Sequence, residues 1–253
     1  DTPPRIALIC GSLRKDSINL KLLKALQKKL KAAGVKSSYV NIGDYDLPLY
    51  HGDLETPPGV KKLIRRLKSF DGVIVVTPEY NGSLPPVLKN AIDWTSTIET
   101  GHISGPVYGI ASCSPGPMSG IMAMRQLQFI LMRLGAELVS KQVGCGFGEQ
   151  AFDKKGHLTA EPAATFADVM IAQMLERIAR KGEWLNLQKS QKRLIKKKSK
   201  RPLIASLSDD KIPEFVAKHL FERRPYYEQA ETIINIDNKT KKKVTKELFK
   251  LLN

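Results

Sequence analysis

Over its first 181 residues the chain alternates between two hydrophobic patterns. Short, nearly continuous apolar runs predict strands that are buried on both faces, as in parallel sheets. Between these runs, apolar residues recur at helical spacing, for example Leu23, Leu26 and Leu30. The repeated strand–helix units predict an α/β fold, a doubly wound parallel sheet with helices on both faces. The predicted strands span 5–10, 36–41, 72–77, 107–112 and 137–143, and the predicted helices span 17–33, 58–69, 85–96, 119–134 and 162–180.

The pattern changes after Gly182, which predicts a boundary near 181–184 between a domain at 1–183 and a segment at 184–253. This segment contains no glycine, and it carries 18 Lys and Arg residues against 8 Asp and Glu residues. We expect its strands to add to the free edge of the sheet, because an isolated strand pair is marginal in water. Its pattern predicts strands at 184–187 and 232–236 and helices at 190–197, 212–230 and 241–252.

Composition excludes some classes of protein. No apolar run reaches the roughly 20 residues of a membrane span, and the first residues enter strand 5–10 without a signal-peptide pattern. The net charge of +16 permits nucleic-acid binding through 189–201 and 239–250, but few aromatic residues accompany those lysines. Three cysteines without metal-binding spacing predict buried, reduced thiols and a cytoplasmic protein, and the four scattered histidines predict no metal site.

The loop at 11–19 follows the first predicted strand and leads into a helix. The amides and the positive dipole end of a helix N-terminus bind anions, so this loop is suited to a phosphate. Ser12, Ser17 and Asn19 add neutral hydrogen-bonding groups, and Arg14 adds a charged donor. The loop matches neither the Walker A pattern nor the GxGxxG pattern. The alternative is a surface turn in which Ser17 only caps the helix.

The loop at 77–83 follows the third predicted strand. Pro78 and Tyr80 offer an apolar and aromatic wall for a flat ring, and Glu79, Asn81 and Ser83 offer hydrogen bonds. Because both loops follow carboxyl ends of parallel strands, where such sheets bind ligands, together they predict a bound flavin. In the alternative interpretation this is a strand-to-helix turn in which Tyr80 only packs. We expect Trp94, at the end of the following helix, to be structural and to cover the sheet.

A third loop, 112–120, follows the fourth predicted strand and is rich in small residues that allow a ligand to approach the backbone. Cys113 in this loop has no evident His or Asp partner that would activate it as a nucleophile. The glycine cluster at 144–148 is a weak signal by itself.

Three motifs together resemble those of the NADPH-dependent FMN reductase family, which includes bacterial quinone and chromate reductases. The resemblance covers residues 4–181. It implies a flavodoxin-like fold, non-covalent FMN, and ping-pong hydride transfer from NAD(P)H through flavin N5 to a small-molecule electron acceptor such as a quinone or a free flavin. The motifs are Gly11-Ser12-Leu13-Arg14 with Ser17-Ile18-Asn19, Thr77-Pro78-Glu79-Tyr80-Asn81 with Ser83 and Pro85, and Leu88-Lys89-Asn90-Ala91-Ile92-Asp93-Trp94.

The resemblance also assigns the cofactor-binding residues, and it implies no catalytic side chain because the flavin carries the chemistry. It implies a homodimer or homotetramer, to which the Met-rich helix 119–134 contributes. An FMN-binding scaffold without turnover is the alternative. Ser12, Arg14, Ser17 and Asn19 would hold the FMN phosphate, Pro78, Glu79, Tyr80, Asn81 and Ser83 would line the ribityl chain and ring, and Ser112 and Gly116 would lie near the far edge of the ring.

Residues 184–253 resemble the C-terminal part of shikimate kinases, which are P-loop enzymes, through 201–204 and 223–230. In that family the residue matching Arg201 belongs to a lid over the phosphates, and the residue matching Arg223 contacts the shikimate carboxylate. No GxxxxGK[ST] motif occurs in the chain, so phosphoryl transfer lacks its phosphate-binding loop. The resemblance therefore implies a chimeric chain in which these two arginines are vestigial.

Overall fold

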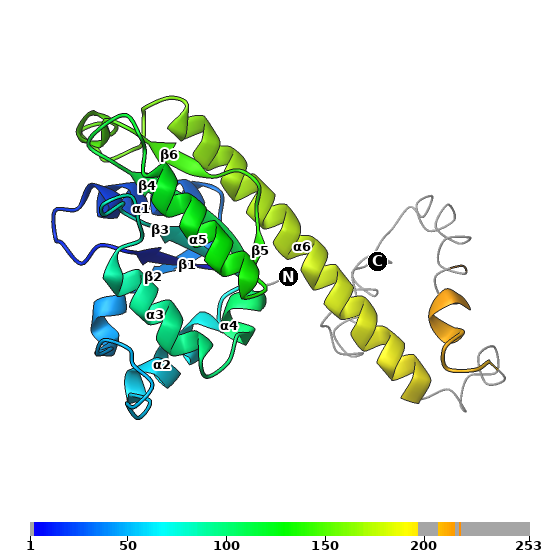
Figure 1. Ribbon diagram of the computed structural model, residues 1–253. Helices are drawn as coiled ribbons and strands as arrows, with labels where there is room; N and C mark the ends of the chain where they lie inside the picture. The colour runs from blue at the N-terminus through cyan, green and yellow to red at the C-terminus, as the bar shows by residue number, and fades with distance from the viewer. Residues whose placement is uncertain (1–2, 197–206, 216–217, 219–253) are drawn as a thin grey trace, which may run out of the picture. The chain divides into compact units, whose positions relative to one another are not determined.

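A parallel β-sheet forms the centre of the computed structural model, which describes residues 3–196, 207–215 and 218 (Figure 1). Five strands run in the order β2-β1-β3-β4-β5, and β6 pairs with the far part of β4. Neighbouring strands are parallel and in register, as where Leu8 pairs with Ile74. The strands are β1 (Arg5–Cys10), β2 (Lys36–Tyr39), β3 (Gly72–Val76), β4 (Val107–Cys113), β5 (Glu137–Leu138) and β6 (Val143–Cys145).

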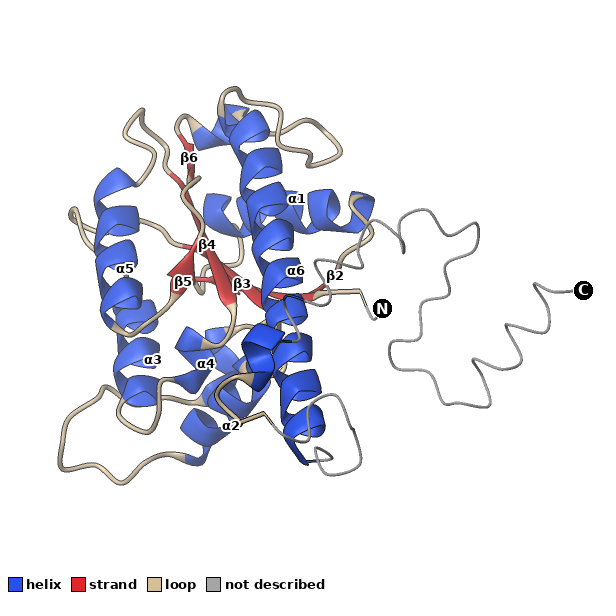
Figure 2. Ribbon diagram, turned by 90° about the vertical axis from the view of Figure 1, so that its right-hand side faces the viewer, coloured by secondary structure: helices blue, strands red, loops and turns tan. Residues whose placement is uncertain are grey.

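Helices cover both faces of the sheet (Figure 2). One face packs against α1 and the first part of α6, and the other packs against α2, α3 and α5. A Cβ at Gly109 of β4 would lie only 2.8 Å from the sulfur of Met174, so this glycine lets α6 pack directly on the sheet. The helices are α1 (Ile18–Ala32), α2 (Pro58–Leu67), α3 (Pro86–Ser96), α4 (Gly101–Ser104), α5 (Ile121–Arg133) and α6 (Ala163–Lys196), with 3-10 turns η1 (Ile42–Tyr45) and η2 (Gly148–Gln150).

The strand order reverses direction between β1 and β3. After β1 the chain goes to β2 on one side, and after β3 it goes to β4 on the other side. The loops after β1 and β3 therefore run in opposite directions, and the position between them is the topological switch point at which such sheets bind ligands. The order 2-1-3-4-5 is that of flavodoxin-like folds. The predicted α/β fold with a doubly wound parallel sheet is therefore confirmed.

Three local predictions were wrong. The predicted strand 137–143 is two short strands, β5 and β6, which pair with different parts of β4. The predicted strand 184–187 is helical, because α6 continues without a break to Lys196. Trp94 packs against Val60 and Ile64 of α2 rather than covering the sheet.

The chain divides into two compact units, Asp1–Glu183 and Trp184–Asn253. In the second unit, the last part of α6 agrees with the predicted helix at 190–197, and 212–215 are helical at the start of the predicted helix 212–230. The predicted strand 232–236, the predicted helix 241–252, Arg201 and Arg223 lie outside the described residues. No helix in the described ranges is both long and apolar enough to cross a membrane.

Candidate functional site

The loop after β1 presents hydroxyl groups at the start of α1. Ser17 is the N-cap of α1, and its Oγ accepts a hydrogen bond of 3.2 Å from the Asn19 amide. The Ser12 Oγ accepts a hydrogen bond of 3.4 Å from the Arg14 amide. Because each hydroxyl accepts an N–H, each keeps its own O–H proton to donate to an anion. The capping role predicted as the alternative for Ser17 is present, and it is compatible with anion binding.

Backbone amides add to this cradle. Within the described part of the chain, the amides of Leu13, Lys15 and Asp16 donate no hydrogen bond to protein atoms. The Arg14 side chain is exposed, and its guanidinium donates to the Asp16 carbonyl over 3.2 Å. Free amides, hydroxyls and a guanidinium at a helix N-terminus are the donor set that a phosphate monoester requires.

Gly11 brings the first two loops together. A Cβ at this position would lie 3.0 Å from Pro85 Cγ and 3.1 Å from Pro78 Cδ, so a larger residue would push the loops apart. The Gly11 amide donates to the Val76 carbonyl over 2.8 Å, which fixes the first loop to the end of β3. The two loops therefore share one edge of the sheet.

The loop after β3 contains a tight hairpin turn that the sequence analysis missed. The Tyr80 and Ser83 backbones exchange two hydrogen bonds of 3.0 Å. Asn81 and Gly82 between them have φ angles of 50° and 71°. The dipeptide Asn-Gly is the strongest sequence signal for such a turn, so the signal was present in the sequence. The turn leaves the Tyr80 side chain 48% exposed.

Side chains of the second loop fix it to α5. The Glu79 carboxylate accepts hydrogen bonds from the Met122 and Ala123 amides, at 2.9 and 3.2 Å. This places a negative charge at the N-terminus of α5, where the helix dipole favours it. Gln126, which the sequence analysis also missed, accepts from the Ser83 hydroxyl at 2.8 Å and donates to the Gly82 carbonyl at 3.2 Å.

Asn19 joins α1 to β4. Its side-chain amide donates to the Cys113 carbonyl and accepts from the Cys113 amide, both at 2.8 Å. Asn19 is buried, and both the NH2 group and the oxygen of its side-chain amide are bound to β4. Asn19 therefore fixes the position of the loop after β1. The side-chain NH2 group has a second N–H, so this role is compatible with the direct phosphate contact that the resemblance implied.

The loop after β4 borders open space at Gly116 and is buried at Ser112. No atom lies within 4 Å of where a Gly116 Cβ would be, so open space adjoins this residue. Ser112 is fully buried, and its hydroxyl has no hydrogen-bond partner among the described residues. A Cβ at Gly120 would lie 1.9 Å from that hydroxyl, so Ser112 faces the underside of the loop.

The three cysteines are free and buried, as predicted. Cys113 and Cys145 are register partners on β4 and β6. A hydrogen bond between the two thiols, together with burial, raises the pKa of Cys113, and the same bond lowers the pKa of Cys145. Burial raises the pKa of Cys10. Buried thiols with raised pKa values are poor nucleophiles, which argues against catalysis by Cys113.

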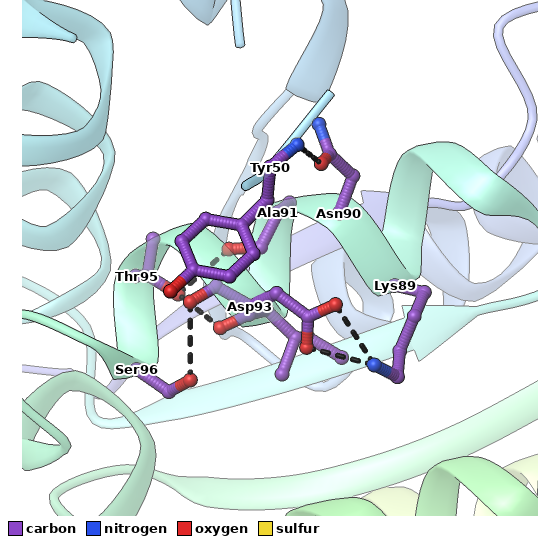
Figure 3. Close-up of polar contacts among 8 residues, drawn as sticks. Tyr50, Lys89, Asn90, Ala91, Asp93, Thr95 and Ser96 are labelled. Carbon is purple, nitrogen blue, oxygen red and sulfur yellow. Dashed lines mark hydrogen bonds and ion pairs between the residues drawn. The ribbon is translucent and has the colours of Figure 1, made fainter. Parts of the chain in front are cut away.

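The third sequence motif holds a neighbouring loop. The Asn90 side chain accepts from the Tyr50 amide at 2.8 Å (Figure 3). It also donates to the Pro48 carbonyl at 2.9 Å. The Trp94 indole donates to the same carbonyl at 2.6 Å, and its ring contacts Tyr50 edge-on, with centroids 5.0 Å apart. On the same helix, Lys89 pairs with Asp93. The motif therefore stabilises the segment between β2 and α2.

Comparisons with known proteins agree with this geometry. Residues 4–150 match the family described as NADPH-dependent FMN reductase. The chain is 35% identical to a quinone reductase of Escherichia coli strain K12 over 141 residues, which cover 54% of this chain and 74% of that protein. It is 32% identical to a 2-hydroxy-1,4-benzoquinone reductase of a Burkholderia species over 181 residues, covering 68% of this chain and 97% of that protein.

A solved structure gives the same result. The flavoenzyme NAD(P)H:(acceptor) oxidoreductase FerB from Paracoccus denitrificans superposes with a TM-score of 0.61 at 32% identity, covering 70% of this chain and 98% of that one. The predicted enzyme class and the predicted cofactors, FMN and NAD(P)H, are confirmed at the level of the family. The chain belongs to the NADPH-dependent FMN reductase family, oxidoreductases with a flavodoxin-like α/β fold.

Proposed function

We propose that the chain is an FMN-dependent oxidoreductase that passes reducing equivalents from NAD(P)H to quinones, free flavins or similar small molecules. The observation that carries the proposal is the meeting of two loops at the sheet edge where strand order reverses. One loop offers a phosphate cradle, and the other offers an apolar and aromatic wall beside it. The close approach of Gly11 in the first loop to Pro78 in the second supports a single ligand that spans both loops.

The phosphate end of the cofactor is assigned to the first loop. Ser12, Ser17 and Arg14 would donate to the phosphate oxygens, together with backbone amides at the start of α1. Asn19, whose amide is bound to β4, would hold the loop in place and keep a second N–H for the phosphate. The residues present fit a phosphate monoester because the loop has more donors than its own acceptors use.

The ring end is assigned to the second and third loops. Tyr80, Asn81 and the backbone near Pro78 would line the ribityl chain and ring, and the open space at Gly116 would admit the far edge of the ring. Glu79 and Ser83 would keep the wall in place through α5. Bound FMN supplies the hydride chemistry by a ping-pong route, so the protein supplies position and electrostatics.

The test is FMN binding and turnover. We expect a yellow protein that oxidises NAD(P)H when a quinone is present. Arg14→Ala should weaken FMN binding about tenfold or more, because a charged hydrogen bond to phosphate is lost. Lys24→Ala, which removes an exposed charge from α1, is the matched control. A wild-type protein that binds no added FMN would refute the proposal, and FMN binding without turnover would favour the scaffold alternative.

We also propose that the protein forms a homodimer or homotetramer through α5. This helix exposes Met122, Phe129 and Met132, with exposed fractions of 46%, 69% and 59%. Apolar residues this exposed along one helix favour contact with another protein surface. Phe129→Glu should lower the molar mass measured by light scattering, whereas Lys24→Ala should not. A monomeric wild-type protein would contradict this assignment.

For the second unit we propose an origin in a protein related to shikimate kinases, on the sequence resemblance alone. The proposal implies a chimeric chain without kinase activity. Separately, we propose that the protein is cytoplasmic. Shikimate-dependent consumption of ATP by the purified protein would contradict the absence of kinase activity.

A further inference from the structure

Backbone strain is concentrated at one edge of the sheet. Among the described residues, four other than glycine have positive φ angles. Each lies in a segment that follows the carboxyl end of a strand, where the flavin site is proposed. Such conformations persist only where the surroundings enforce them, and they cluster at functional sites. These residues are Asp46 after β2, Asn81 after β3, Ser119 after β4 and Phe147 after β6.

Phe147 differs from Asp46 and Asn81 among these residues. Asn and Asp tolerate the left-handed region because their short polar side chains bond locally, but a bulky aromatic residue does not. Phe147 has φ 49°, and its side chain is 57% exposed although it is apolar. Neither backbone preference nor burial in the core therefore explains a phenylalanine at this position.

The third loop holds Phe147 in place. Its amide donates to the Gly116 carbonyl over 3.1 Å, and its carbonyl accepts from the Gln150 amide over 2.9 Å. The next residue, Gly148, donates to the Ser114 carbonyl over 2.9 Å. A Cβ at Gly146 would lie 3.1 Å from the Gly116 carbonyl oxygen, so the two loops are in close contact. The aromatic residue is thus bonded directly to the residue that borders open space.

We infer that Phe147 is a specificity-determining residue whose ring stacks against the flat ring of a quinone-type electron acceptor. This inference rests on the proposed function, which places a flat ring near Gly116. An aromatic side chain has only two side-chain torsions, so it loses little conformational freedom when it stacks on a planar ligand. The strained backbone is then explained as the means by which the ring is presented at the site edge.

The experiment compares variants of Phe147 in the FMN-loaded protein, with 1,4-naphthoquinone as the acceptor. Phe147→Gly removes both the ring and the strain, Phe147→Asn removes the ring but tolerates the backbone, and Phe147→Tyr keeps a ring. We expect KM for the quinone to rise about tenfold in the Gly and Asn variants and to remain near the wild-type value in the Tyr variant. Ile98→Ala removes an exposed apolar side chain beyond α3 and is the control.

Thermal unfolding separates this effect from misfolding. Phe147→Gly should unfold no earlier than the wild type, because glycine adopts a positive φ without strain. An unchanged quinone KM in both ringless variants, with an active wild type, would refute the inference alone. A change of oligomeric state in the Gly and Asn variants, with KM unchanged, would assign Phe147 to a subunit contact instead. A wild type without FMN-dependent turnover would refute the proposed function and this inference with it.

Discussion

His102 should make the protein sensitive to acid. Its side chain lies in the core formed with α2, α3 and α5, where the residue is 1% exposed. Neither ring nitrogen has a hydrogen-bond partner among the described residues. The ring borders a cavity of about 40 Å³ that is otherwise lined mostly by apolar side chains. Burial lowers the pKa of His102 from 6.5 to about 4, with opposing smaller effects of Glu99, which raises it, and Lys68, which lowers it.

The sign and size of the effect follow from linkage. Between pH 6.5 and about pH 4 the unfolded chain binds a proton at His102 and the folded chain does not, so the free energy of unfolding falls as the pH falls. Each pH unit in this window contributes about 1.4 kcal/mol, so the loss reaches about 3 kcal/mol. Below about pH 4 this residue adds no further loss, because both states are then protonated.

The assay compares the wild type with His102→Leu. Urea unfolding followed by circular dichroism gives the free energy of unfolding of each protein between pH 7.5 and 4. Other acid-sensitive groups are common to both proteins, so their effects cancel in the difference. We expect His102→Leu to gain about 3 kcal/mol relative to the wild type as the pH falls through the window. His51→Leu, at an exposed imidazole, controls for loss of the ring. A difference between wild type and His102→Leu that is independent of pH would refute the reasoning.

Three further predictions concern close contacts. Gly59→Ala should destabilise the protein by about 1–3 kcal/mol, because the added Cβ would lie 1.7 Å from the Tyr45 carbonyl oxygen, and a thermal melt measures this. Glu79→Ala should cost about 1 kcal/mol through loss of the α5 cap, with Glu79→Gln closer to the wild type in urea unfolding. Asn90→Ala should speed hydrogen exchange at 47–50 more than elsewhere, and unchanged protection there would contradict the assigned role of its amide.

The sequence predicted the central strands because each is buried on both faces. The predicted strand 72–77 is β3, Gly72–Val76, and the predicted helix 17–33 is α1, Ile18–Ala32. The hydrophobic patterns of these two elements are strong because apolar residues face the core along the whole length of each element. The positions of the ligand-binding loops were predictable for the same reason. Once the parallel strands are known, the loops that follow them must lie at the carboxyl edge of the sheet.

The errors fall where local pattern and long-range packing disagree. The sequence pattern predicts one strand at 137–143, but polar residues in its middle separate β5 from β6, and each pairs with its own part of β4. Segment 184–187 has an apolar pattern short enough to fit a strand. It is helical because α6 continues through Gly182, where no neighbour lies within 4 Å of a Cβ, so nothing in the packing ends the helix there.

The roles of site side chains were harder to predict than their positions. Glu79 and Ser83 are predicted to line the ligand, and both also bond to α5, a partner more than 40 residues away that no local pattern reveals. Asn19 likewise bonds to β4. Each loop is therefore held by a side-chain or glycine contact within the protein. A site whose walls are already fixed loses little entropy on binding, so the residues that fix the loops contribute to affinity without touching the ligand.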